Sequence, residues 1–233
     1  MIYTVIADIE EIQKAQKRDC HVAWQPLSLI PKDTLEYINN AKSEKVRAER
    51  LAAYSALFVA LDKLFEKRGM LLHRTANGKP YLTENNEKSN VNISISHTDG
   101  LAVVSLSTDG EIGVDIQSEI SDEMAKRLEK RFFDNVTVSN TSLETIIYFL
   151  EQSPDGQLIL TPISEIDKIK VSDNQGLEFT KKWAFSESVL KCCGTGFLGA
   201  ASLDKLAQNT KTAIYTLSSK TNTYALAITK KQL

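Results

Sequence analysis

A short segment, residues 112–117, contains the side chains best suited to chemistry. Its apolar residues alternate with Gly113, Asp115 and Gln117. In a β-strand, alternate side chains point to opposite faces, so Asp115 and Gln117 would project together, and Gly113 would leave open space beside them. Carboxylate and amide oxygens are ligands that Mg²⁺ accepts. The pattern therefore indicates a metal site, and the alternative is the solvent-facing edge of a strand, where these residues have no special role.

A second group of candidate residues lies on a predicted helix, residues 179–193. Trp183, Glu187 and Lys191 follow one another at intervals of four, which places them on one helical face. The carboxylate is suited to a metal ion or a proton, and the ammonium group to a phosphate. The same spacing is typical of a surface ion pair between Glu187 and Lys191, worth about 0.2–0.5 kcal/mol.

Further polar residues occur at turns and in a basic run. Ser96 and His97 end a predicted strand, where His97 is suited to donate a hydrogen bond to a phosphate. Lys79 lies in an Asn-Gly-Lys-Pro turn and would by itself be an ordinary exposed lysine. Arg47 belongs to the basic run 42–50, a pattern that most often marks a solvated helix face.

The elements that must position these residues are helices and strands in no regular alternation. The predicted helices are 43–67, stopped by Gly69, then 122–133 and 179–193. The predicted strands are 1–7, 91–96, 101–107, 111–117, 212–217 and 224–229, with a hairpin joining 101–107 to 111–117 and another around Asp155-Gly156. This order argues for an α+β fold rather than a parallel, doubly wound sheet.

The composition excludes several classes of protein. The 233 residues carry 28 Lys and Arg against 30 Asp and Glu, so no basic field favours nucleic acid or an anionic membrane. No apolar run approaches the roughly 18–20 residues of a membrane span, and the first residues lack the pattern of a signal peptide. The three cysteines suggest neither a disulfide framework nor a zinc site. We therefore expect a cytoplasmic protein.

Four motifs, taken together and in order, resemble the signatures of a known family. They are Asn-Gly-Lys-Pro at 77–80, Ser-Ile-Ser-His at 94–97, Gly-Val-Asp-Ile-Gln at 113–117, and Trp-x-x-Ser-Glu-Ser-x-x-Lys-x-x-Gly at 183–194. The series is similar to that of the 4′-phosphopantetheinyl transferases, in the larger two-lobed class that resembles the enzymes activating peptide synthetases. The resemblance covers roughly residues 45–135 and 179–229.

The resemblance implies a fold and an activity. The fold would be two similar α+β lobes, 1–110 and 111–233, related by a pseudo-twofold axis, with coenzyme A between them. The activity would be transfer of 4′-phosphopantetheine from coenzyme A to a serine hydroxyl of an acyl or peptidyl carrier protein, which releases adenosine 3′,5′-bisphosphate. Because two internal lobes supply a complete cleft, we expect a monomer.

The resemblance also assigns roles to the candidate residues. Glu187 and Lys191 would be catalytic, with Glu187, or a water that it orients, as the base for the serine hydroxyl. Asp115 and Glu187, with Gln117, would bind Mg²⁺ or Mn²⁺. The residues expected to contact coenzyme A are Lys79, Ser96, His97, Asp115, Lys191 and Arg47.

The chain departs from the family pattern at three positions. Gln117 replaces an acidic residue and offers no negative charge, so it predicts a weaker metal site. Ser186 replaces a lysine and Tyr54 an arginine, and each removes one cation. The segment 134–178 is longer than the usual link and would adjust carrier choice or be a neutral insertion. These departures leave open a second function, a coenzyme A-binding or carrier-binding homologue with weakened catalysis.

Overall fold

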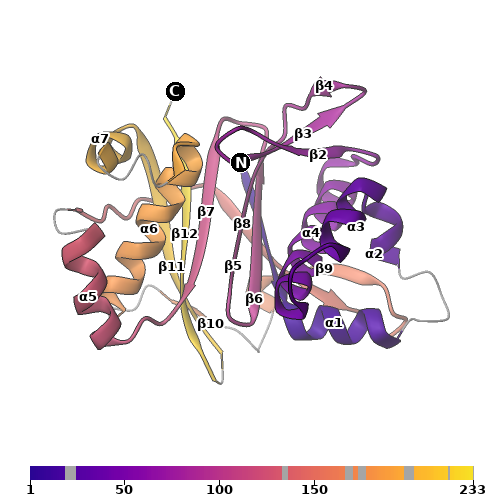
Figure 1. Ribbon diagram of the computed structural model, residues 1–233, viewed down its shortest axis with the longest axis horizontal. Helices are drawn as coiled ribbons and strands as arrows, with labels where there is room; N and C mark the ends of the chain where they lie inside the picture. Colours follow the sequence, from indigo (N-terminus) through magenta and orange to yellow (C-terminus); the bar gives the residue numbers. More distant parts are fainter. Residues whose placement is uncertain are drawn as a thin grey trace.

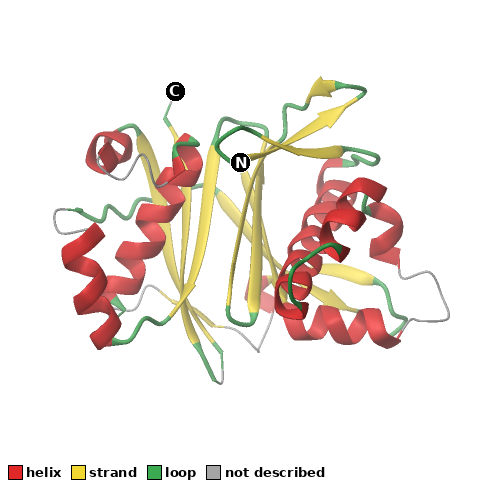
Figure 2. Ribbon diagram, in the orientation of Figure 1, coloured by secondary structure: helices red, strands yellow, loops and turns green. Residues whose placement is uncertain are grey.

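The computed structural model describes residues 1–18, 25–132, 136–165, 170–172, 177–196, 202–219 and 221–232. Within these residues the chain forms the expected α+β fold. Two sheets lie in the middle of the molecule, and helices cover the outer face of each (Figure 1, Figure 2). None of the helices in the described residues combines the length and apolar character needed to cross a membrane.

The first sheet has five strands in the order β5-β6-β1-β8-β9. Their bounds are β1 Ile2–Asp8, β5 Asn92–Thr98, β6 Leu101–Ser107, β8 Thr145–Gln152 and β9 Leu158–Pro162. Strand β1 pairs antiparallel with β6 and parallel with β8. The outer face of this sheet packs against the long helix α4 (Glu44–Phe65) and against α1 (Ile9–Arg18). Two short helices, α2 (Gln25–Leu29) and α3 (Lys32–Asn39), lie beside α4.

Helix α4 begins and ends at residues whose chemistry explains its bounds. The Ser43 hydroxyl accepts a hydrogen bond from the Val46 amide at 3.3 Å, which satisfies a free donor of the first turn. The helix ends at Phe65 because Glu66 adopts a left-handed conformation, with φ 53°. The expected stop at Gly69 was therefore a few residues too late, although Gly69 also has positive φ in the following turn.

The second sheet has four strands in the order β10-β11-β12-β7. Their bounds are β7 Ile112–Ser118, β10 Lys170–Ser172, β11 Thr210–Ser218 and β12 Thr223–Lys231. Helix α6 (Glu178–Cys193) packs on β7 and β12, with α5 (Asp122–Phe132) and α7 (Leu203–Gln208) beside it. As expected, α6 ends at Gly194, whose φ is 68°. The predicted end of α5, Phe133, lies outside the described residues.

The inner faces of the two sheets pack against each other through one apolar cluster. Ile2 and Ile6 of β1 meet Ile112, Val114 and Ile116 of β7 in this cluster, and all five are at most 2% exposed. The predicted alternation of residues 112–117 is therefore confirmed. Because the apolar side chains of β7 fill the space between the sheets, its polar side chains point outward, toward α6.

The chain runs through a similar series of elements twice. Strand β1, helix α4 and the pair β5–β6 give the sheet order β5-β6-β1, and strand β7, helix α6 and the pair β11–β12 give the order β11-β12-β7. All pairings within both series are antiparallel. The hairpin β8–β9 lies outside both series: β8 pairs with β1, so residues 145–162 belong to the first sheet.

One predicted strand pairing is wrong. The strands β6 and β7 form at the expected residues, but they belong to different sheets and do not make a hairpin. Strand β6 already has β5 on one side and β1 on the other, so it has no free edge for β7. The true hairpin joins β5 to β6 through Gly100, whose φ is 87°. The second expected hairpin, β8–β9 around Gly156, is confirmed.

Hydroxyl side chains of β5 join the two sheets at their edges. The backbone amides of Val114 and Ser118 in β7 donate to Ser94 Oγ at 2.9 Å and to Thr98 Oγ1 at 3.1 Å. Between these bonds, the Ile116 amide donates to Ser96 Oγ at 3.5 Å. The Ser-x-Ser-x-Thr pattern of β5 thus takes the place of a neighbouring strand's carbonyl groups. We call this row of bonds the β5–β7 seam.

A third, smaller sheet projects beside the seam. It consists of β2 (Leu71–Arg74), β3 (Pro80–Glu84) and β4 (Glu87–Lys88) in that order, and it lies at the upper right in Figure 1. The predicted Asn-Gly turn connects β2 to β3: Gly78 has φ 82°, and its amide donates to the Thr75 carbonyl at 2.9 Å.

Candidate functional site

Asp115, Ser96 and Lys191 meet where the β5–β7 seam lies against α6. Lys191 Nζ is 2.6 Å from Asp115 Oδ1 and donates to Ser96 Oγ at 2.9 Å. The Ser96 hydroxyl in turn donates to Asp115 Oδ1 at 2.7 Å. The Asp115 side chain is only 7% exposed, whereas that of Lys191 is 30% exposed. Three predicted residues from three elements thus form one cluster, and Asp115 does not lie on a solvent-facing strand edge.

Glu187 lies one turn before Lys191 on α6 and close to the same cluster. Burial and the nearby Asp115 carboxylate raise its pKa, and the Lys191 ammonium opposes this rise. Its Oε1 atom is buried and has no hydrogen-bond partner. Lys191 pairs with Asp115 and not with Glu187, so the surface ion pair expected from their spacing does not form. A half-buried carboxylate with an unpartnered oxygen beside a second carboxylate is suited to bind a proton or a cation.

Gly113 lets α6 approach β7 closely enough to form this cluster. A Cβ atom at Gly113 would lie 2.0 Å from the Ser188 carbonyl oxygen and 2.5 Å from the Cys192 amide nitrogen. The expectation of open space beside Asp115 was therefore wrong, because the helix backbone fills that space. The missing side chain serves close packing of helix on strand.

Gln117 contributes less to the cluster than its place on the strand predicted. Its side-chain amide donates to the Ser118 carbonyl at 3.1 Å. Among the described residues, no group of three or more His, Cys, Asp or Glu side chains is arranged to hold a metal ion. The donor set therefore consists of Asp115 and Glu187. Two carboxylates still fit Mg²⁺, which commonly takes one or two protein carboxylates and completes its shell with water and substrate phosphate oxygens.

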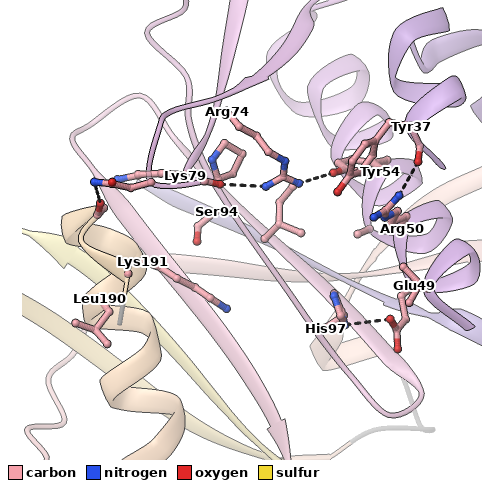
Figure 3. Close-up of a pocket in the computed structure, with 18 residues that line it drawn as sticks. Tyr37, Glu49, Arg50, Tyr54, Arg74, Lys79, Ser94, His97, Leu190 and Lys191 are labelled. Carbon is pink, nitrogen blue, oxygen red and sulfur yellow. Dashed lines mark hydrogen bonds and ion pairs between the residues drawn. The ribbon is translucent and has the colours of Figure 1, made fainter. Parts of the chain in front are cut away.

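A pocket of about 390 Å³ opens beside this cluster, between α4 on one side and the end of α6 on the other (Figure 3). Lys191 belongs to both, since its side chain lines the pocket and its Nζ binds Asp115. The charged and hydrogen-bonding side chains in the pocket wall are Tyr37, Glu49, Arg50, Tyr54, Arg74, Asn77, Lys79, Ser94, His97 and Lys191.

Two arginines at the α4 end of the pocket have no carboxylate partner among the described residues. Arg74 donates to the Tyr54 hydroxyl at 2.7 Å and to the Gly78 carbonyl at 3.1 Å. Arg50 lies over the Tyr37 ring at 3.8 Å and donates to the Tyr37 carbonyl at 2.7 Å. Neutral partners orient both guanidinium groups and leave their charges uncompensated, so this end of the pocket favours an anion.

Lys79 and His97, both predicted, also line the pocket, and each has an acidic neighbour. Lys79 Nζ donates to the Glu111 carboxylate and to the Cys192 carbonyl, the latter at 2.7 Å. His97 Nδ1 is 3.6 Å from Glu49 Oε2, and its side chain is 49% exposed. Both residues therefore line the same pocket as Arg50 and Arg74.

Arg47 and Ser186 do not line the pocket, whereas Asp115 and Ser96 adjoin it through Lys191. Arg47 pairs with Glu44 at 2.6 Å on α4, which matches the alternative of a solvated helix face. Ser186 is fully buried, and its hydroxyl donates to the Lys182 carbonyl of its own helix at 2.7 Å. At position 186, where the transferase family pattern has a lysine, the serine side chain therefore points into the protein.

Sequence reasoning missed Arg74 and Tyr37 and did not single out Arg50. Arg74 is three residues before the Asn-Gly turn, and a hairpin there returns it to the pocket beside Lys79. The Asn-Gly turn was therefore the sequence signal that could have identified Arg74. Tyr37 comes from α3, and no motif linked it to the site. The sequence matches no protein-family model, and a comparison with curated proteins gives no match.

Proposed function

We propose that this chain is a 4′-phosphopantetheinyl transferase that moves 4′-phosphopantetheine from coenzyme A to a carrier-protein serine. The observation that carries this proposal is the position of Lys191, which joins the Asp115–Glu187 carboxylate pair to a pocket lined by cations. Carboxylates for a divalent ion next to cations for phosphates are what a pyrophosphate substrate requires.

The connectivity of the chain supports the proposal. The repeated series of strand, helix and antiparallel strand pair is what two similar lobes would give, and the pocket lies between α4 of the first series and α6 of the second. We propose that the two series are the lobes of the transferase and that a pseudo-twofold axis relates them. The hairpin β8–β9 would then be an addition from the second lobe to the sheet of the first.

The pocket suits the nucleotide part of coenzyme A. Its volume of about 390 Å³ lies in the usual range for small-molecule sites, roughly 300–1,000 Å³. The arginines Arg50 and Arg74 would neutralise phosphate charge, and Lys79 and His97 would add hydrogen-bond donors. Lys191 would bind the pyrophosphate, because its partly exposed ammonium group reaches the pocket from the carboxylate side.

In the proposed reaction, the serine oxygen forms a bond to the phosphorus that carries pantetheine. The bond from that phosphorus to the bridging oxygen of the pyrophosphate breaks, and adenosine 3′,5′-bisphosphate leaves with the negative charge. A divalent ion bound at Asp115 and Glu187 would supply charge neutralisation of the pyrophosphate. Glu187, or a water that it orients, is the proposed acceptor of the serine proton. Lys191 would offset charge on the leaving phosphate.

The test is incubation of the protein with coenzyme A, Mg²⁺ and a panel of acyl and peptidyl carrier proteins. We expect intact-mass measurement to show addition of one phosphopantetheine group to at least one carrier, and no addition to a carrier whose acceptor serine is replaced by alanine. The proposal would be refuted if no carrier in the panel is modified and coenzyme A leaves the melting temperature of the folded protein unchanged.

A second function, a coenzyme A-binding or carrier-binding homologue with weakened catalysis, is favoured by one observation. Gln117 donates to Ser118 and leaves two carboxylates where the family pattern has three acidic positions. This alternative predicts a coenzyme A-dependent rise in melting temperature without transfer in a single-turnover experiment. An active transferase predicts both the rise in melting temperature and transfer to the carrier.

A further inference from the structure

Lys191 already binds the carboxylate that the proposed function assigns to a divalent ion. Its Nζ lies 2.6 Å from Asp115 Oδ1 and donates to Ser96 Oγ at 2.9 Å. The Asp115 side chain is only 7% exposed, and a carboxylate that is buried to this extent requires a charge partner. Lys191 is therefore the counter-ion of Asp115 in this structure.

Glu187 completes the pair of carboxylates that a divalent ion would use. It lies close enough to Asp115 for the two negative charges to repel each other. Its Oε1 atom is buried and has no hydrogen-bond partner, so Lys191 satisfies only one of the two carboxylates. The unpartnered oxygen beside a second carboxylate fits a hard cation, which accepts carboxylate oxygens as ligands.

Lys191 and a divalent ion would compete for Asp115. Both oxygens of a carboxylate belong to one carbon, so an ion bound at either would be a near neighbour of the ammonium group at Oδ1. Water screens charges poorly around a side chain that is almost wholly buried, and the repulsion between the two cations is correspondingly strong. Two ionised carboxylates balance one divalent ion, which leaves the lysine as the surplus charge.

The pocket offers Lys191 a second place for its charge. The side chain of Lys191 is 30% exposed and lines the pocket together with Arg50 and Arg74. Figure 3 shows this side chain extending away from α6, toward the side of the pocket that α4 forms. A lysine side chain has four rotatable carbons and carries its charge on a compact ammonium group, so it can exchange one anionic partner for another.

We propose that Lys191 moves from Asp115 to a phosphate group of the ligand when a divalent ion binds the two carboxylates. This inference rests on the proposed function, which supplies both the ion and the phosphate ligand. The exchange couples the two sites, because ion binding frees a cation for the ligand and ligand binding withdraws that cation from the ion site. By linkage, each should raise the affinity for the other by the same factor.

The first experiment follows side-chain ammonium and carboxyl signals of the full chain by NMR, during titration with MgCl₂ at constant ionic strength. Lys191→Arg identifies the ammonium signal of Lys191, and Glu187→Gln identifies the carboxyl signal of Glu187. Both signals of the parent should change together as Mg²⁺ is added. The signal of Lys79, which donates to the Glu111 carboxylate and the Cys192 carbonyl, is the control and should stay unchanged.

The second experiment measures the affinity for coenzyme A by titration calorimetry, with and without Mg²⁺. We expect Mg²⁺ to raise the affinity of the parent about tenfold. In Lys191→Met the increase should be less than about threefold, because only the direct attraction between ion and phosphate remains. Lys79→Met should bind coenzyme A more weakly at both Mg²⁺ concentrations and keep the tenfold increase. An equal increase in the parent and in Lys191→Met would contradict the exchange.

Failure of this inference and failure of the proposed function give different results. If Mg²⁺ shifts the Glu187 carboxyl signal while the Lys191 ammonium signal stays as it was, the lysine remains on Asp115 and only the exchange is overturned. If Mg²⁺ shifts neither signal, the metal site of the proposed function is wrong, and the exchange is overturned with it. The NMR titration is made on the parent chain, so it decides the question even if Lys191→Met does not fold.

Discussion

Lys191 Nζ lies 2.6 Å from Asp115 Oδ1, so a helix and a strand 76 residues apart in the chain are joined by one ion pair. The Asp115 side chain is almost wholly buried, whereas the Lys191 side chain is 30% exposed. This difference decides how the pair responds when either partner is removed.

Replacement of Lys191 by methionine should destabilise the protein by about 3 kcal/mol, because it leaves a buried carboxylate without its charge partner. Asp115→Asn should cost less, about 1–2 kcal/mol, since the remaining ammonium group can reach water. Urea denaturation of both variants and of the double variant measures the coupling. A larger cost for Asp115→Asn than for Lys191→Met would contradict this account.

Glu187→Gln should slow carrier transfer by at least about 10²-fold and still leave a folded protein. Folding raises the pKa of Glu187 above its ordinary value of 4.5, so its contribution to stability is fully present below pH 4.5 and is lost as the pH rises through the raised pKa. At pH 7 the variant should therefore melt at a higher temperature than the parent. The difference should shrink as the pH falls toward 4.5.

The ionisation of Glu187 predicts the acid limb of the rate profile. A proton acceptor must be ionised, so single-turnover transfer should fall as the pH drops, and the fall should move to lower pH as the Mg²⁺ concentration rises, because a divalent ion bound at Glu187 favours the ionised carboxylate. Near-normal turnover by Glu187→Gln would show that another group takes the serine proton.

Gly113→Ala should cost about 3 kcal/mol or more, because its Cβ would lie 2.0 Å from the Ser188 carbonyl oxygen and would push α6 away from β7. Gly69→Ala is a suitable control, since a Cβ there meets nothing within 4 Å and the cost comes only from a positive φ, about 1 kcal/mol. Chemical denaturation measures both. Equal losses of stability in the two variants would mean that α6 can move away from β7 without a cost in free energy.

Arg74→Met should weaken the binding of adenosine 3′,5′-bisphosphate by roughly 10-fold or more, because it removes a charged donor from the pocket. Tyr54→Phe should have a smaller effect, since Arg74 keeps its bond to Gly78. Arg68→Met serves as the control, because Arg68 pairs with Asp62 and does not line this pocket. Titration calorimetry measures all three. If Arg74→Met binds as the parent does, the anion lies elsewhere.

Local periodicity predicted most of the elements but not how they pair. The alternation in 112–117 reports which face of the strand is apolar, and that face is buried as expected. The helix predicted over 179–193 forms as α6. Strand neighbours depend on contacts between distant residues, so the sequence predicted a β6–β7 hairpin where β7 in fact pairs with β12. For the same reason the transfer of β8–β9 to the first sheet was not expected.

In the candidate site, too, local sequence patterns predicted which residues take part but not all of the contacts between them. Asp115, Ser96, His97, Lys79 and Lys191 were found because motif order identified them, and the structure brings them to one pocket and its adjoining cluster. The pairing of Lys191 with Asp115 was not anticipated, because spacing along α6 reports only neighbours on that helix. The role of Gly113 was also missed, since the approach of the Ser188 backbone cannot be inferred from the strand alone.

The β5–β7 seam has a consequence for how the molecule behaves in crowded solution. Strands β5 and β7 are the terminal strands of their sheets, and such strands normally offer amide groups to any passing chain. Here Ser94 and Thr98 already accept the amides of Val114 and Ser118. The hydroxyls of the first sheet therefore protect the edge of β7 from strand addition, and replacing them with valine would expose that edge as a template for aggregation.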